Sequence, residues 1–375
     1  MKSEKGDPMT PTQSPQIGHT PRFSLFSLLF SLFIVHCSLL IACATPPSDR
    51  TAAPTAPTWV TSLEREYPSR QWIAVTAEGA SQSQAEQAAM NALARAFRTD
   101  IASLTQATQR FIQIIDTATG IRTITFSESE NFRQDVNTTT NIKGLIGVQI
   151  DTYRAPNNTV YVCARMNRRE CAARYSGMIR ENTAIINTLL TAAAPAGTFE
   201  AYSRLSFAHA IAEITDNFQN LLEVLDPTTA NRRPAYGGAN SIKTKMLECA
   251  SLITIGITIT TEQQADKTLL TRAAGSFFRD LGFKVNEQGN GNYVLRANIR
   301  FETITQNVIS SRYYIDAALE NANRTAIFTF TEDDRKAHPN METEARRLAV
   351  RAAETSFKEG KFAQEFDAWL NTLIE

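Results

Sequence analysis

The stretch WIAVTAEGASQSQAEQAAMNALARAF, residues 72–97, decides the fold of the first half of this chain because its hydrophobic period changes partway along. The apolar run from Trp72 to Val75 predicts a β-strand. The overlapping pairs Ser81-x-x-Gln84 and Ser83-x-x-Glu86 are capping boxes, which mark the first turn of a helix. Apolar residues then recur every three or four positions, which predicts an alanine-rich stripe that packs on a sheet: Ala85, Ala88, Ala89, Ala92, Leu93, Ala96, Phe97 and Ile101.

Downstream of this helix, three segments alternate apolar and polar residues as half-buried strands do. A helical continuation is expected near residues 105–114, and the strands are expected at 121–129, 144–153 and 159–166. Asn157-Asn158 is a turn signal between the last two strands. The first half therefore predicts an antiparallel sheet with helices packed on it.

Two long helical segments follow. Residues 168–190 return to the helical period, and a second helix is expected from Thr198 to Leu225, where Asp226-Pro227 ends it. These segments predict a helical hairpin. Residues 231–240, with Gly237-Gly238, have the composition of a linker.

The last part of the chain predicts a second α+β domain. Expected strands are 251–260, 283–285, 293–301, 313–319 and 325–330. Helices are expected at 262–281, capped by Gly282, and as a final helical region at 340–373. Gly289-Asn290-Gly291-Asn292 lacks the spacing of a phosphate-binding loop and is expected to be a turn. The predicted fold class is α+β: two small domains, each a mostly antiparallel sheet packed with helices, joined by a helical hairpin.

The apolar run from Phe23 to Ala42 indicates where the protein resides. It ends in Leu40-Ile41-Ala42-Cys43, which has the pattern of a bacterial lipobox. In such signals the leader is cleaved before the cysteine, and acyl chains such as palmitate anchor Cys43 in the membrane. An uncleaved transmembrane anchor is the alternative, since about 20 apolar residues can span a bilayer. Met9 is a second candidate start.

Charge and composition exclude some functions. The chain has 38 basic and 38 acidic residues, and residues 1–42 hold three of the former and two of the latter. A balanced chain without a long basic block lacks what phosphate-backbone binding needs, so nucleic acid is not an expected partner. Residues 44–57 are rich in Ala, Thr and Pro and are expected to form a tether.

The cysteines and histidines do not predict a metal site, a cofactor site or a catalytic set. Once residues 1–42 and Cys43 are set aside, Cys163, Cys171 and Cys249 remain, without C-x-x-C spacing. Cys163 and Cys171 could form a disulfide, although the position of Cys163 in an alternating strand is typical of a small core residue. His209 and His338 fall in different predicted domains. We therefore expect a protein that is not an enzyme.

Two charged motifs have both a functional and a structural interpretation. Glu332-Asp333-Asp334 could bind a cation, but a solvated acidic loop at a strand end is the expected role. The densest basic cluster could bind an anionic polymer or lipid head group, but a solvent-facing helix turn is expected: Arg165, Arg168, Arg169 and Arg174.

Several of these residues, taken in order, resemble the LPP20 family of bacterial envelope lipoproteins over residues 57–180: Trp59, Tyr67-Pro68, Trp72 to Val75, Gly79, Ser83-x-x-Glu86 with its alanines, and Tyr161 to Met166. The resemblance implies an envelope lipoprotein, at the surface or associated with flagella, and supplies no catalytic residue. The C-terminal part more weakly resembles small α+β modules of outer-membrane assembly and flagellar-base lipoproteins.

The expected organisation is a signal peptide at 1–42, the lipidated Cys43 and tether at 43–57, and an LPP20-like domain at 58–180. A helical connector at 181–230, a linker at 231–240 and a C-terminal domain at 241–375 follow. The expected function is a non-enzymatic, membrane-anchored docking component of the bacterial envelope, on the periplasmic or surface face of the outer membrane, with other envelope proteins as partners. The alternative is a ligand-binding or carbohydrate-processing protein, which would need facing carboxylates in a cleft.

Overall fold

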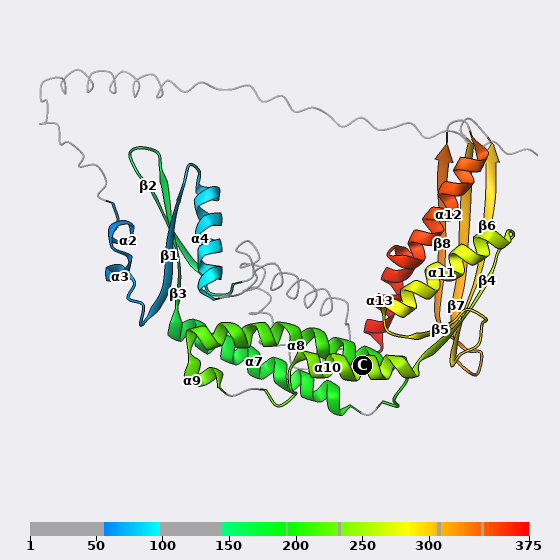
Figure 1. The fold of residues 1–375 in the computed structure, drawn as a ribbon, viewed down its shortest axis with the longest axis horizontal. Helices are drawn as coiled ribbons and strands as arrows, with labels where there is room; N and C mark the ends of the chain where they lie inside the picture. Colours follow the sequence, from blue (N-terminus) through cyan, green and yellow to red (C-terminus); the bar gives the residue numbers. More distant parts are fainter. Residues whose placement is uncertain are drawn as a thin grey trace, which may run out of the picture. The chain divides into compact units, whose positions relative to one another are not determined.

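The computed structural model describes residues 56–97, 145–192, 194–231, 234–305, 309–338 and 341–374 (Figure 1). Residues 56–375 form one compact unit, separate from residues 1–55. The predicted leader, Cys43, most of the tether, the helical continuation at 105–114 and the strand at 121–129 lie outside the described residues.

The first sheet has three antiparallel strands in the order β1-β3-β2. They are β1 (Trp72–Gly79), β2 (Gln149–Arg154) and β3 (Val160–Asn167), as the sequence predicts. Helix α4 (Gln82–Ala96) begins at the predicted cap, where the Ser81 hydroxyl accepts a hydrogen bond from the backbone N–H of Gln84. The turn between β2 and β3 holds Asn158 at a φ of 65°, a conformation that asparagine tolerates well.

Helix α4 packs on β1 and β3, and its alanines allow the close approach that the sequence predicts (Figure 1). Ala85, Ala89 and Leu93 are fully buried there. The short helices α2 (Thr58–Thr61) and α3 (Leu63–Glu66) contact β3 and β1, respectively.

The predicted helical hairpin consists of α7 (Arg168–Thr191) and α8 (Phe199–Leu225). A buried hydrogen bond of 3.0 Å from Asn182 Nδ2 to Thr215 Oγ1 joins the two helices. Helix α7 runs through residue 180, so the predicted domain boundary there falls inside one helix, and the division into domains stays a prediction. Asp226 ends α8 and caps the short helix α9 (Pro227–Ala230).

The second sheet has five strands in the order β5-β4-β6-β7-β8. The strands are β4 (Thr254–Thr260), β5 (Lys284–Asn286), β6 (Tyr293–Thr305), β7 (Ile309–Glu320) and β8 (Ala326–His338). The longest ladders, β6 with β7 and β7 with β8, are antiparallel, whereas β4 pairs parallel with β5 and β6. Helix α11 (Gln264–Asp280) makes the crossover from β4 to β5, and Gly282, with a φ of 90°, ends it as predicted. The protein is thus an α+β fold with two sheets.

Helices α11, α12 (Glu342–Lys358) and α13 (Lys361–Thr372) cover one face of this sheet (Figure 1). Between helices and sheet lies a cluster of aromatic side chains, in which the rings of Phe362 and Phe366 meet those of Phe277, Phe278 and Phe328. Helix α8 contributes to both cores, since Phe199 and Tyr202 at its start pack with the second one.

The structure corrects two predicted elements of this half. Residues 239–252 form helix α10, so the strand predicted from residue 251 begins at Thr254 instead. The final helical region is broken at Gly360, whose N–H bonds back to the carbonyl of Thr355. The Ser356 hydroxyl then accepts a hydrogen bond from the N–H of Phe362 in the first turn of α13.

The predicted turn at residues 289–292 packs directly on β4. A Cβ atom on Gly256 would lie 2.5 Å from the carbonyl carbon of Gly289, so only glycine fits at this strand position. The motif is therefore a structural turn, as the sequence indicates.

Candidate docking surfaces

The side of β6, β7 and β8 that faces away from the helices is an array of polar side chains, called the outer face below. Strand alternation places the apolar residues toward α12 and the polar ones on the opposite side. The register sets Glu302 opposite Arg312, and Arg312 opposite Arg335. The charged and aromatic members of the outer face are Arg296, Arg300, Glu302, Arg312, Tyr314, Asp316, Glu320, Asp333 and Arg335.

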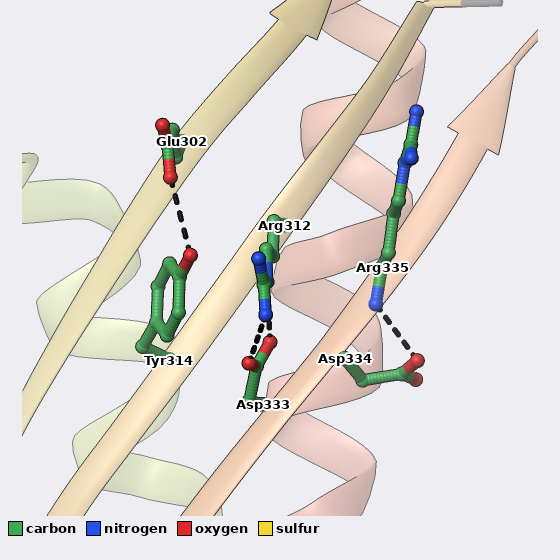
Figure 2. A network of polar contacts seen from close by, with 6 residues as sticks. All are labelled: Glu302, Arg312, Tyr314, Asp333, Asp334 and Arg335. Atoms are coloured by element: carbon green, nitrogen blue, oxygen red, sulfur yellow. Dashed lines mark hydrogen bonds and ion pairs between the residues drawn. The ribbon is translucent and has the colours of Figure 1, made fainter. Parts of the chain in front are cut away.

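Contacts between strands orient these side chains (Figure 2). Arg312 and Asp333 form a bidentate pair, with Arg312 Nε donating to Asp333 Oδ1 over 2.6 Å and Nη2 donating to Oδ2. The Tyr314 hydroxyl donates to Glu302 Oε2 over 3.2 Å, and the Arg312 guanidinium lies 4.9 Å from the centre of the Tyr314 ring. Hydrogen bonding from Arg312 lowers the pKa of Asp333, so this carboxyl stays ionised.

The outer face carries a mixture of positive and negative charges instead of a field of one sign. Arg296 pairs with Glu320 on the neighbouring strand over 2.9 Å, which repeats the pattern of the Arg312 pair. Such a surface matches a partner by the positions of its charges and not by net attraction.

The prediction of an acidic loop at residues 332–334 is wrong, because these residues lie within β8. Successive residues of a strand point to opposite sides, so the three carboxylates do not converge. Asp333 joins the outer face, while Asp334 pairs with Lys336 over 2.6 Å. Glu332 accepts hydrogen bonds from the hydroxyls of Tyr313 and Ser356 on the helix side of the sheet.

A second polar cluster lies on the face of the first sheet that is opposite α4. Arg165 Nε donates to Asp151 Oδ2 over 2.7 Å, and the Tyr67 hydroxyl donates to the same oxygen over 2.8 Å. The Arg165 guanidinium also lies 4.7 Å from the Tyr67 ring centre and 5.1 Å from that of Trp72. The Arg165 hydrogen bond lowers the pKa of Asp151, whereas desolvation, followed by the bond to Asp151, raises the pKa of Tyr67 to about 12. Through these contacts, Tyr67, which follows α3, packs against the first sheet.

The four arginines of the basic cluster do not form one patch. Arg165 belongs to the ion pair on the first sheet. Arg168 Nη1 donates to the carbonyl of Val224 over 2.6 Å, which places a cation at the C-terminal end of α8. Arg169 and Arg174 are exposed on the first turns of α7.

Two cavities of the described residues contain carboxylates, which bears on the carbohydrate-processing alternative. The larger, about 1000 Å³, includes Glu170 and Asp226, but Asp226 caps α9 and hydrogen bonding from Thr229 lowers its pKa. The smaller, about 440 Å³, includes Glu213, Asp280 and Asp367 beside His209. Desolvation raises the pKa of Asp367 although the residue as a whole is exposed.

Cys163, Cys171 and Cys249 are free and buried. Cys163 faces the Asp151 side of the sheet, and burial raises its pKa to about 12. Cys171 lies at the start of α7, where its sulfur is 3.8 Å from the carbonyl oxygen of Gly147, and burial raises its pKa to about 11. The two cysteines that could pair by sequence are therefore unpaired core residues.

Among the described residues, no group of three or more His, Cys, Asp and Glu side chains could hold a metal ion. No helix within that same part of the chain has the length and hydrophobicity to cross a membrane. The predicted lipidation site, Cys43, lies outside the described residues and stays a prediction.

Comparison with known proteins finds only weak structural similarity. No family model matches the chain, and no curated protein matches it. Among solved structures, a secreted protein from Helicobacter pylori covers 76% of this chain and 97% of its own length, at 11% identity and a TM-score of 0.34. A minor lipoprotein from Acinetobacter baumannii covers 32% of this chain and 90% of its own, at 13% identity and a TM-score of 0.23. TM-scores this low carry no argument about family or function.

Proposed function

We propose that this chain is a bacterial envelope lipoprotein, anchored by acyl chains on Cys43, that docks other envelope proteins and catalyses no reaction. The outer face carries the docking part of this proposal. Its cross-strand ion pairs hold charged side chains at defined positions, and among the described helices none packs on that side of the sheet. A protein surface with carboxylates and arginines at complementary positions is the partner it fits.

The anchor and the folded part are connected by residues 44–57. Helix α2 begins at Thr58, so this segment, at ~3.1 Å per residue when extended, lets the folded part reach about 40 Å from the membrane. That distance suits a component that meets partners near the bilayer without entering it. We further propose membership of the LPP20 family, an outer-membrane location, and a role near flagella or outer-membrane assembly sites.

Labelling and crosslinking in intact cells test the anchor and the docking role separately. With labelled palmitate, we expect incorporation into the native chain and none into a Cys43→Ala variant. Crosslinking followed by mass spectrometry is expected to recover envelope proteins that are lost with Cys43→Ala. Recovery of no protein at saturating crosslinker would refute docking.

A charge exchange tests the outer face without removing its ion pair. The double variant Arg312→Asp/Asp333→Arg keeps two opposite charges in contact but reverses their positions, so we expect weaker crosslinking to the partner. The matched control exchanges the exposed pair Glu344 and Arg347 on α12, which contact each other over 2.7 Å. Equal partner recovery from the two exchanges and the native chain would show that the outer face does not dock.

The ligand-binding or carbohydrate-processing alternative rests on the 440 Å³ cavity. Burial raises the pKa of Asp367, and a carboxyl with a raised pKa in a cavity that contains other carboxyl groups is an arrangement that acid catalysis uses. Release of reducing sugars from envelope polysaccharide by the native chain, and its loss in Asp367→Asn, would favour this alternative over docking.

A further inference from the structure

The cavity of about 1000 Å³ lies where three separate parts of the chain meet at the start of α7. Arg70 and Gln71 come from the turn before β1, and Asn167 to Arg169 come from the junction of β3 and α7. Leu225, Asp226 and Thr229 come from the end of α8 and from α9. Side chains from distant sequence positions thus line one open cavity.

Two of its three arginines have side chains without a hydrogen-bonding partner among the residues that the structure describes. The side chains of Arg70 and Arg169 are exposed and make no hydrogen bond or ion pair with any residue that the structure describes. Arg168 is fixed instead, with Nε donating to the Ser69 carbonyl over 2.9 Å and Nη1 to the Val224 carbonyl over 2.6 Å. Arg70 and Arg169, which line the same cavity as the fixed Arg168, are therefore available to bind a ligand.

The two carboxylates of the cavity do not neutralise these arginines. Asp226 accepts from the backbone N–H groups of Thr228 and Thr229 and from the Thr229 hydroxyl. Glu170 is exposed and forms no ion pair with a described arginine.

The backbone of the α7 start adds little to anion binding, because two of its first three N–H groups already have partners. The Arg168 N–H donates to the Gln71 carbonyl over 2.9 Å, and the Glu170 N–H donates to Asn167 Oδ1 over 3.1 Å. The guanidinium groups are the available donors, and their planar forks match the paired oxygens of a phosphate group.

We propose that this cavity binds a phosphate group between Arg70 and Arg169, carried either by a free phosphate compound or by a lipid head group. The site is separate from the outer face, so it does not depend on the docking proposal. It differs from the solvent-facing helix turn that the sequence predicts, because Arg70 is about 100 positions away along the chain and joins Arg169 only in the fold.

Titration calorimetry with inorganic phosphate tests the site on the exported chain, residues 43–375, carrying Cys43→Ser so that no lipid is attached. We expect saturable binding to the native cavity and at least a tenfold weaker binding to Arg70→Gln/Arg169→Gln. The control Arg272→Gln/Arg351→Gln removes two exposed helix arginines outside the cavity and should bind as before. Arg70→Lys/Arg169→Lys keeps the charge and should bind more weakly than the native protein, because the fork geometry is lost.

A second experiment, with lipid vesicles, identifies whether the phosphate group belongs to a lipid head group or to a free compound. Cosedimentation with phosphatidylglycerol vesicles but not phosphatidylcholine vesicles, lost in the Arg70/Arg169 double Gln variant, would assign the site to a lipid head group. Phosphate binding without vesicle binding would assign it to a free compound. No saturable phosphate binding up to about 10 mM together with no vesicle binding, or equal binding by the double Gln variant, would overturn the proposal.

Discussion

The ion pair of Arg165 and Asp151 gives the sharpest test of how the first sheet holds the chain that follows α3. The perturbation is a pair of substitutions at one position, Asp151→Ala and Asp151→Asn. Alanine removes both acceptor oxygens of the Arg165 and Tyr67 hydrogen bonds, while asparagine keeps one acceptor oxygen, replaces the other with an NH2 group and removes the charge. The two variants therefore separate the loss of charge from the loss of all contacts.

The expected loss of unfolding free energy follows from how far the Arg165–Asp151 pair is buried. The side chains of Arg165 and Asp151 are 19% and 33% exposed, which places them between a surface pair, worth about 0–1 kcal/mol, and a buried pair, whose disruption costs about 3–5 kcal/mol. We therefore expect Asp151→Ala to lower the free energy of unfolding by about 2 kcal/mol. We expect about 1 kcal/mol for Asp151→Asn, since a neutral hydrogen bond replaces a charge-assisted one.

Urea unfolding followed by circular dichroism and tryptophan fluorescence measures both values. Trp72 is a useful local reporter because its ring lies against both Tyr67 and the Arg165 guanidinium. A double-mutant cycle with Arg165→Met isolates the pair, and the coupling energy is expected to be about 1–2 kcal/mol. Equal stability of the alanine and asparagine variants, or a coupling near zero, would refute the reasoning.

The stabilisation by the Arg165–Asp151 pair is expected to decrease in acid. Hydrogen bonding from Arg165 lowers the pKa of Asp151 below its ordinary 3.8. The pair therefore stabilises the protein fully above pH 3.8, and this contribution is lost as the pH falls through the lower pKa of the folded state. The stability difference between the native protein and Asp151→Asn should be constant from neutral pH down to about pH 5 and shrink in stronger acid.

Three further predictions concern buried groups. Cys163 and Cys171 should react with a maleimide only after denaturation, as shown by mass spectrometry with and without urea, and rapid labelling of the folded chain would contradict their burial. Glu332→Ala should lower the unfolding free energy by about 2–3 kcal/mol, because two buried hydroxyls lose their acceptor; an effect below about 0.5 kcal/mol in chemical denaturation would show that they find other partners. Asn182→Ala should cost about 1–2 kcal/mol by opening the hydrogen bond between α7 and α8, and an unchanged melting temperature would argue against that bond.

The elements that could be predicted from the sequence are those with local signals at their ends. Ser81, Thr198 and Gly282 each mark a helix end with hydrogen bonds to residues a few positions away, so the pattern is complete within a short window. The strands of both sheets were predicted where apolar and polar residues alternate. These signals need no knowledge of distant contacts, which is why α4, α8 and α11 were found.

Helix α10 was missed because its start lacks such a signal. Its N-cap is Gly238, which has no side chain to bond to the first turn, and the glycine pair before it has the composition of a linker. A stripe of Ile242, Met246, Cys249 and Ala250 at helical spacing was nevertheless present and would have identified the helix.

The candidate sites were harder to predict because their residues meet only through tertiary structure. The predicted strands ended near Phe301 and Phe330, where the apolar alternation stops, yet β6 and β8 continue through charged residues that pair across the sheet. Arg312 and Asp333 are 21 positions apart and become neighbours only through the register of β7 and β8. Periodicity within one strand says nothing about which strand lies beside it.

The position of β8 at the end of the strand order bears on how a partner would approach. A long edge strand offers unpaired backbone groups to another strand, and proteins discourage such pairing with charged side chains. The second half of β8 carries Asp333, Asp334, Arg335 and Lys336 in succession, and Lys361 Nζ contacts the carbonyl oxygen of Thr331 over 3.3 Å. A partner strand added here would have to accommodate four consecutive charges, whereas a partner that contacts the outer face can match the ion pairs between its strands. This argues for docking through the face of the sheet. It follows that Lys336→Thr, which changes the edge and leaves the outer-face pairs intact, should not affect partner crosslinking, and a large loss in that variant would instead implicate the edge.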